Sequence, residues 1–361
     1  MKTYAAAFAA AVAAGMLIQG TTSGWGAVPG AVLAPLAAGL AAGAAAFFLF
    51  RSKGARCLSR FAPFFPFLAA AAAAAMKVFG RSYRGGVFLP GGVNPMEAVK
   101  PLLVFFAAEM AARIRESPSP AKARLQFAGG LAVFAASAAV LNDFGLMAVL
   151  GLAAMGIVFL DSAAAGALSA AAGAAGGLLL WMFPPAHVAR RIKAWTDPFG
   201  DATGAGWQLL KAREVMVAGG VFGAEFGDGG AAACIPVASS DFVYAVVAGE
   251  WGLAGCLALL AVYAVFAWAG LWIAAGARDL RSRLAAGGFA VLVAVQVVLN
   301  AGGVAGALPM TGLTLPFASR GGSSLAVSVA CALAAAGLAL APGEEPPAAE
   351  KRVRSGKRRR R

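Results

Sequence analysis

The chain is a succession of long apolar stretches separated by short polar connections. Most of the stretches run for roughly 17 to 25 residues, which is the length an α-helix needs to cross a hydrocarbon core about 30 Å thick. They lack the short alternating pattern of an outer-membrane barrel. The pattern therefore predicts an all-α polytopic membrane protein with about ten transmembrane helices. The expected spans are residues 4–20, 27–50, 61–79, 97–112, 126–142, 144–160, 164–184, 242–275, 284–306 and 323–341.

One polar stretch, residues 190–250, interrupts this pattern far more than any other. It begins with a cluster of cations, continues through a glycine-rich run and closes on Ser239, Ser240 and Asp241. We expect a large extracytoplasmic loop at about 185–241, between the seventh and eighth helices, and we expect any chemistry to lie there. The domain prediction is a single transmembrane domain over 1–342, followed by a basic, disordered cytoplasmic tail over 343–361.

The distribution of charge predicts the orientation in the membrane. The chain has 361 residues, 60% of them hydrophobic, and a net charge of +14. Of its 30 Lys and Arg residues, 19 fall within 51–60, 113–124, 278–283 and 351–361. By the positive-inside rule these segments, and both termini, lie on the cytoplasmic side of the membrane. The tail is expected to contact anionic membrane lipids, and we expect no nucleic-acid partner.

Cations also occur on the loops that this topology places outside. Arg81 and Arg84 lie in one such loop, Arg190 and Arg191 begin the large loop, and Arg320 lies in the last one. Cations gathered on the outer face favour an anionic substrate such as a diphosphate. The alternative is that they are ordinary solvated loop charges.

Three polar features lie close to the expected spans. Glu97 and Lys100 are three residues apart on one helix face, where they either pair with each other or face a substrate. Asp143 is placed to cap the helix that follows it. The Pro-, Gly- and Ser-rich stretch 308–324 cannot cross lipid exposed, so we expect it to line a cavity, where Gly321 and Gly322 permit close approach of a ligand.

Cysteine and histidine usage excludes several other kinds of site. The four cysteines have no C-x-x-C spacing, so neither a disulfide framework nor a zinc site is indicated. A single histidine, His187, excludes a His-rich metal centre. We therefore predict no metal ligands from spacing alone.

Four stretches together resemble the SEDS family of FtsW, RodA and SpoVE. The first two are Asn94-Pro95-Met96-Glu97 with Lys100, similar to the family's Gln-Pro-Ser-Glu-x-x-Lys, and Asn142-Asp143-Phe144-Gly145, similar to its Gln-Pro-Asp-Phe-Gly-Thr. The third is the loop that ends in Asp241-Phe242-Val243-Tyr244. The last and most specific is Leu315-Pro316-Phe317-x-Ser319-x-Gly321-Gly322-Ser323-Ser324, with Pro309, Thr311, Gly312 and Asn300 before it.

The resemblance implies a fold, an activity and partners. The family's fold has ten transmembrane helices with a large outer loop between the seventh and eighth. Its activity is peptidoglycan glycosyltransfer, in which lipid II is polymerised into glycan strands for cell division or elongation, beside a class B penicillin-binding protein. Asp241 matches the family's catalytic aspartate. The expected substrate-binding residues are Glu97, Lys100, Arg84, Arg190, Arg191, Ser319, Arg320, Gly321, Gly322 and Ser323.

Two alternatives stay open at this point. The spans and charges also suit a lipid II flippase, although a flippase needs access from both leaflets. The family's glutamate and histidine just before Asp241 are replaced by Val237 and Ser239, which keeps open a non-catalytic scaffold that activates a penicillin-binding protein. No cofactor is certain, but a divalent cation such as Mg²⁺ or Mn²⁺, held by Asp241 or Glu97, could share in catalysis.

Overall fold

The protein is seen here in a computed structural model. The structure describes residues 1–23, 28–83, 86–90, 93–182, 184–201, 205–224, 233–235, 238 and 240–342. Arg84 and the basic tail 343–361, both of which carry sequence predictions, lie outside these residues.

Each expected apolar stretch coincides with a long helix. These helices are α1 (Lys2–Ser23), α2 (Val28–Lys53), α3 (Phe65–Phe79), α4 (Met96–Glu116), α5 (Ala121–Val140), α6 (Phe144–Asp161), α7 (Ala163–Met182), α11 (Val243–Ala275), α12 (Leu280–Val304) and α13 (Gly322–Ala339).

The composition of the helices confirms a helical membrane protein. Within the described residues, eight helices are long and apolar enough to cross a membrane, and Ala163–Leu178 of α7 forms a shorter apolar helix. Helix α4 is not among them, since it carries Glu97, Lys100 and Glu109 among its apolar residues. Ten crossings therefore stay a prediction.

A small hairpin departs from the all-helical prediction. Strands β1 (Arg81–Tyr83) and β2 (Gly86–Phe88) pair antiparallel, with Arg81 opposite Phe88. Each strand has only three residues, whereas an alternating pattern becomes readable over about four to eight. The hairpin joins α3 to the segment before α4.

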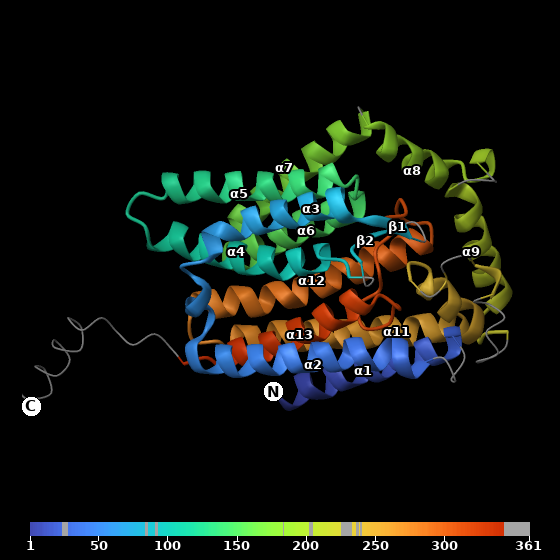
Figure 1. Cartoon of the computed structure of the whole chain (residues 1–361), viewed down its shortest axis with the longest axis horizontal. Helices are drawn as coiled ribbons and strands as arrows, with labels where there is room; N and C mark the ends of the chain where they lie inside the picture. The colour runs from blue at the N-terminus through green and yellow to red at the C-terminus, as the bar shows by residue number, and fades with distance from the viewer. Residues whose placement is uncertain are drawn as a thin grey trace, which may run out of the picture.

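The long helices run side by side, with α12 at the centre of the bundle (Figure 1). Helix α12 contacts α4, α6, α11 and α13, and its apolar stretch is 72% buried. Helix α2 packs along α13, where a Cβ at Gly39 would lie 2.7 Å from the Ala326 carbonyl oxygen. Small residues thus allow the close helix packing typical of proteins in lipid.

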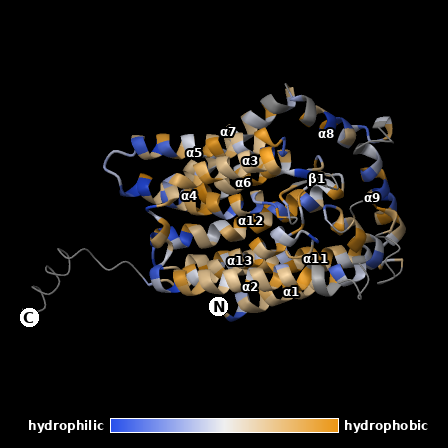
Figure 2. Ribbon diagram, in the orientation of Figure 1, coloured by the Kyte–Doolittle hydropathy of each residue, from blue (hydrophilic) through white to orange (hydrophobic). Residues whose placement is uncertain are grey.

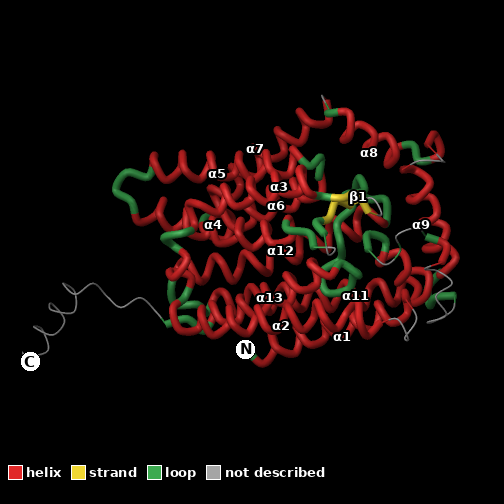
Figure 3. Tube along the Cα trace, viewed as in Figure 1, coloured by secondary structure: helices red, strands yellow, loops and turns green. Residues whose placement is uncertain are grey.

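The two ends of the bundle differ in structure. At one end lie β1, β2 and the two helices of the large loop, α8 (Ala186–Thr196) and α9 (Ala205–Gly219), as Figures 1 and 3 show. Short 3₁₀ turns join other parts: η2 (Ala55–Leu58), η3 (Ala62–Phe64) and η4 (Phe199–Asp201). The basic connections α2–α3, α4–α5 and α11–α12 lie at the opposite end, where Figure 2 shows hydrophilic residues.

Helix α11 is broken near its start. Gly252 has φ 67° and ψ −168°, so residues 243–251 form a short section distinct from the rest of the helix. The turn after α9 satisfies the freed amides, because the N–H groups of Leu253 and Ala254 donate to the carbonyls of Gly220 and Val221. Asp241 therefore lies just before a short helical section that is hydrogen-bonded to the turn after α9.

Candidate functional site

A cavity of about 960 Å³ opens at the end of the bundle that carries α8 and α9. Its walls come from the hairpin, the start of α4, the α5–α6 junction, α8, α9, the segment before α11, the loop 305–321 and the start of α13. The volume is that of a site for a small to medium-sized ligand. Carboxylates and cations from several of these segments line it, so the cavity can hold an anionic group next to an acid or base.

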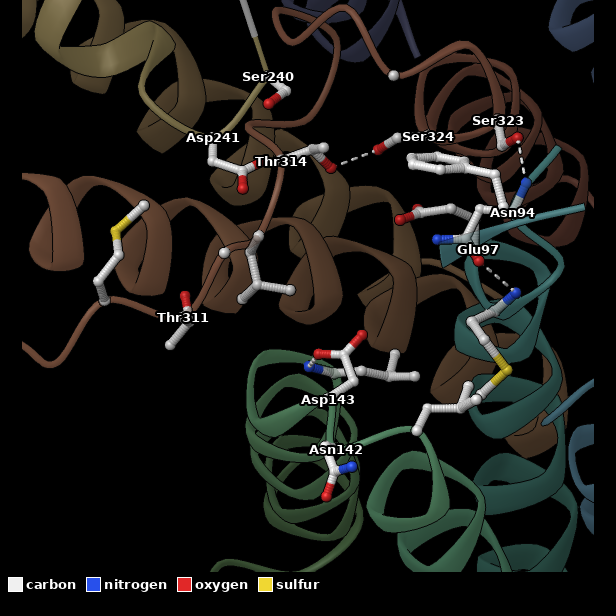
Figure 4. A pocket seen from close by; sticks show the side chains of 18 of the residues that line it. Asn94, Glu97, Asn142, Asp143, Ser240, Asp241, Thr311, Thr314, Ser323 and Ser324 are labelled. Carbon is white, nitrogen blue, oxygen red and sulfur yellow. Dashed lines mark hydrogen bonds between the residues drawn. The ribbon is translucent and has the colours of Figure 1, made fainter. Parts of the chain in front are cut away.

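Asp241 enters this cavity from the residue pair that precedes α11 (Figure 4). Burial raises the pKa of its carboxyl from the ordinary 3.8 to about 6, and the nearby Asp143 carboxylate adds to the rise. A hydrogen bond from Ser240 and the charge of Arg191 offset part of it. A carboxylate with a pKa just below neutral is ionised at pH 7 and is suited to accepting a proton.

Arg191 reaches the cavity from α8. Val188 and Ala194 of this helix are buried, while Arg190 and Lys193 are exposed. The Arg191 guanidinium donates to the Met310 carbonyl at 2.9 Å, and the Trp195 indole N–H donates to the Gly306 carbonyl at 2.7 Å. Two hydrogen bonds therefore hold α8 against the loop 305–321.

Gly312 lies close to the side chains of both Arg191 and Asp241. A Cβ built on Gly312 would be 3.7 Å from Nη1 of Arg191 and 3.7 Å from Oδ2 of Asp241. Its φ of 71° is one that an L-amino acid adopts rarely. The glycine lets the loop pass close beside both charged groups.

Asp143 faces the same space from the start of α6 (Figure 4). Asn142, with φ 53°, turns the chain after α5, and Asp143 then caps α6 by accepting from the Leu146 N–H at 2.8 Å. The cap predicted from the sequence is confirmed. Burial raises the pKa of the Asp143 carboxyl, against the opposing effects of the Leu146 N–H, Lys100 and Arg191.

Glu97 and Lys100 form an ion pair in the first turns of α4, with Nζ 2.8 Å from Oε2. The Lys100 side chain is only 4% exposed, and both residues line the cavity. Nζ also donates to Oε1 of Gln296 on α12 at 3.2 Å. The structural ion pair expected from the sequence is present, and it lies where a substrate would contact it.

Side chains from the bundle hold the loop 305–321 by its backbone. Asn300 donates to the Leu313 carbonyl at 2.5 Å and to the Asp241 carbonyl at 3.0 Å. Ser319 donates to the Ser240 carbonyl at 2.5 Å and accepts from the Leu315 N–H at 2.7 Å. These two residues fix the Asp241 backbone against the loop.

The cavity brings together most of the site residues predicted from the sequence. It is lined by Glu97, Lys100, Arg191, Asp241, Arg320, Gly321, Gly322 and Ser323. Ser323 also accepts from the Asn94 N–H at 3.0 Å, which joins α13 to the segment before α4.

Two of the other predicted residues, Arg190 and Ser319, do not line the cavity. Arg190 is exposed on α8 and is not among the residues that line the cavity. Ser319 is 2% exposed and lies behind the wall, so its geometry fits a positioning role and not direct contact with substrate. Arg84 lies outside the described residues.

The sequence reasoning did not single out several residues of the wall, among them Met76 and Thr314, nor Gln296 behind it, and it named Arg81 only as a cation of an outer loop. A signal for Gln296 was present in the sequence. It lies four residues before Asn300 in an otherwise apolar stretch, so both polar side chains share one face of α12. Polar residues on one face of a membrane helix favour contact with the protein interior.

The described residues hold no group of three or more His, Cys, Asp or Glu side chains arranged to bind a metal ion. Such a group is not required by every metal, because Mg²⁺ is commonly held by one or two carboxylates together with substrate phosphates. The divalent cation stays a prediction.

Comparison with known proteins identifies the relatives of this chain. Residues 43–338 match the model of the FtsW/RodA/SpoVE family, described as cell cycle protein. Peptidoglycan glycosyltransferase RodA of Mycobacterium tuberculosis is 39% identical over 151 residues, which cover 42% of this chain and 32% of that protein. Peptidoglycan glycosyltransferase MrdB of Escherichia coli is 38% identical over 155 residues, 42% of each protein. The matched region thus spans a third to two fifths of these relatives.

A solved structure extends the likeness over nearly the whole fold. A chain from a study of structural coordination of polymerization and crosslinking by a peptidoglycan synthase complex superposes with a TM-score of 0.74 at 26% identity. The match covers 94% of this chain and 97% of that one. Because the family model matches most of the chain, and the fold agrees with it, the chain belongs to the FtsW/RodA/SpoVE family of cell cycle proteins.

Proposed function

We propose that this protein is a peptidoglycan glycosyltransferase that polymerises lipid II at the outer face of the bacterial cytoplasmic membrane. The observation that carries the proposal is the cavity in which the Asp241 carboxylate lies beside Arg191 and which Lys100 also lines. It combines a proton acceptor with cations for a diphosphate. Relatives named peptidoglycan glycosyltransferases support the same activity.

The reaction is a single displacement with inversion. Lipid II carries its sugar in an α-linkage to diphosphate, and the glycan product has a β-linkage. The Asp241 carboxylate takes the proton of the acceptor hydroxyl, and the oxygen attacks the anomeric carbon. The bond from that carbon to the diphosphate oxygen breaks, and its electron pair leaves with undecaprenyl diphosphate. General-base assistance of this kind contributes about 10²–10⁴ in rate.

The leaving diphosphate is stabilised by the cations of the wall. Arg191 and Arg320 offer planar guanidinium groups that suit phosphate oxygens, and Lys100 offers an ammonium. Cations placed where negative charge develops are commonly the largest catalytic contribution. A bound Mg²⁺ or Mn²⁺ would supply further Lewis-acid stabilisation at the diphosphate, with Asp241 or Glu97 as the protein carboxylate.

The predicted orientation agrees with this role. The cavity opens at the end of the bundle opposite the basic connections, which the positive-inside rule assigns to the cytoplasm. The donor and acceptor lipids then reach it from the outer leaflet. A class B penicillin-binding protein is the proposed partner, in keeping with the complex of polymerisation and crosslinking named for the related structure.

The test uses the purified protein in liposomes with fluorescent lipid II and its cognate penicillin-binding protein. Polymer length is followed by gel electrophoresis, and transbilayer movement of lipid II by quenching from outside. We expect polymer that depends on the partner. Transbilayer movement without polymer would establish the flippase alternative. The absence of both activities would favour the non-catalytic scaffold.

Metal dependence is tested in the same assay. If a divalent cation shares in stabilising the diphosphate, a chelator abolishes polymerisation, and Mg²⁺ or Mn²⁺ restores it. Unchanged rates after chelation would show that the cations of the protein suffice.

A further inference from the structure

A series of polar contacts runs along the cavity wall and passes through Gln296 behind it. It runs from Glu97 to Lys100 at 2.8 Å, from Lys100 to Gln296 at 3.2 Å, and from Gln296 to the Thr314 carbonyl at 2.8 Å. The Thr314 hydroxyl continues it to Ser324 at 2.7 Å, as Figure 4 shows. The series thus joins α4, α12, the loop 305–321 and α13.

Among these residues, the Gln296 side chain contacts both a cation, Lys100, and a backbone carbonyl, that of Thr314. It is 3% exposed on the central helix. Its Oε1 accepts from the Lys100 ammonium, and its Nε2 donates to the carbonyl and hydroxyl oxygens of Thr314. A neutral amide supplies one acceptor and two donors, so a single orientation satisfies every contact.

The two acceptors define where the Lys100 ammonium points. An ammonium has three N–H donors, and within the described residues Glu97 and Gln296 take two of them. Lys100 lines the cavity, so the remaining N–H is available to a ligand there. Without Gln296 the flexible four-carbon side chain would keep only the Glu97 contact on its own helix.

We propose that Gln296 is a positioning residue: it holds the Lys100 ammonium toward the cavity so that Lys100 binds the diphosphate of the lipid substrate. Gln296 does not line the cavity and acts through Lys100. The inference rests on the proposed function, because it names the partner of one cation in that site. It also explains why an amide occupies the apolar centre of the bundle.

The experiment is a double-mutant cycle on ligand binding. Binding of undecaprenyl diphosphate to the full chain in nanodiscs is measured for wild type, Gln296→Met, Lys100→Met and the double variant, with undecaprenyl monophosphate for comparison. Methionine keeps the length of the side chain and avoids a cavity. We expect Gln296→Met to weaken diphosphate binding by about tenfold when Lys100 is present and by less than about twofold in Lys100→Met, since residues that act together are not additive.

Gln19→Leu is the matched control. Gln19 is also buried, at 2% exposed, and donates to a carbonyl of the same loop, that of Phe317, from α1. It does not contact Lys100, so its effect should be equal in both Lys100 backgrounds. Gln296→Leu, which is also neutral and apolar, is the second variant if the methionine variant is not monodisperse, and its effect must likewise disappear with Lys100→Met.

The outcomes separate the two proposals. An equal loss from Gln296→Met in both backgrounds, as for Gln19→Leu, would mean that Gln296 only supports the loop, and would overturn this inference alone. Failure of the wild-type protein to bind undecaprenyl diphosphate would overturn the inference together with the proposed function.

Discussion

The Asp241 carboxyl is buried and lies close to the guanidinium of Arg191. Its ionisation state decides whether it can accept a proton. The motif resemblance named Asp241 and Lys100 as candidate site residues, and both line one cavity. It did not predict that Arg191 would lie beside Asp241, because the two residues are separated by the whole large loop. That contact depends on how α8 packs against the loop 305–321, which no local pattern encodes.

The rate of polymerisation should depend on pH through Asp241. Its pKa of about 6 means that the carboxylate is the majority form above that pH, so the rate rises as pH increases through about 6 and then levels. Arg191→Met removes a charge that favours the carboxylate, and should move this rise to higher pH. The measurement is the pH profile of the initial rate. Arg190→Met, an exposed neighbour, is the control and should leave the profile in place.

The burial that raises the pKa of Asp241 should also lower the free energy of unfolding once the carboxyl is ionised. Its pKa is raised in the folded state, so the stabilisation present at acidic pH is lost as pH rises through about 4 to 6. Asp241→Asn should therefore raise the thermal midpoint at about pH 8, corresponding to as much as about 3 kcal/mol, and the gain should fall to about half of that at about pH 5. An equal change at both pH values would contradict this. Exposed Asp197 has no burial to relieve, so Asp197→Asn should show no such gain at alkaline pH.

Helix α11 shows what the pattern of elements could and could not predict. Its apolar run predicted a span over 242–275, in agreement with the helix observed. The break at Gly252 was not predicted, because a glycine in an apolar run is tolerated in many membrane helices. The break depends on the turn after α9, whose carbonyls accept from the second section of α11.

Gly252→Ala should disrupt this junction. A Cβ would lie 2.4 Å from the Gly223 nitrogen and 2.4 Å from the Val221 carbonyl oxygen, at a φ of 67°. The strained backbone alone costs of the order of 1–2 kcal/mol. We expect a lower thermal midpoint and slower polymerisation, since the section that follows Asp241 loses its fastening. Gly129→Ala, where a Cβ meets no atom within 4 Å, should leave both unchanged or slightly improved.

At the scale of the whole molecule, the length of the apolar stretches predicted the bundle, because a long apolar stretch has one stable structure in lipid, a helix. The cavity could not be predicted in the same way. Its walls come from segments as distant in sequence as Arg81 and Ser324, and their approach depends on packing around the central α12. The resemblance of motifs indicated which segments to consider, and the fold shows that they meet.

The orientation predicted from charge can be tested with single cysteines. Cys57, Cys234, Cys256 and Cys331 are free and are first replaced by alanine. Phe222 lies in the turn after α9, and Arg283 lies near the start of α12, at the opposite end of the bundle. Two variants then carry one cysteine each, Phe222→Cys or Arg283→Cys. In intact cells, a membrane-impermeant maleimide should label the cysteine at 222 and leave that at 283 unlabelled until the membrane is opened. The reverse pattern would invert the proposed topology.

The most direct test of the central claim is the formation of glycan polymer from labelled lipid II by the purified protein with its penicillin-binding partner, comparing wild type with Asp241→Asn. Asparagine keeps the shape of the side chain but cannot accept the proton of the hydroxyl, so the account predicts polymer from wild type and a loss of at least about a hundredfold in the variant at equal folded amounts. Polymer formed at comparable rates by both proteins would show that Asp241 is not the base.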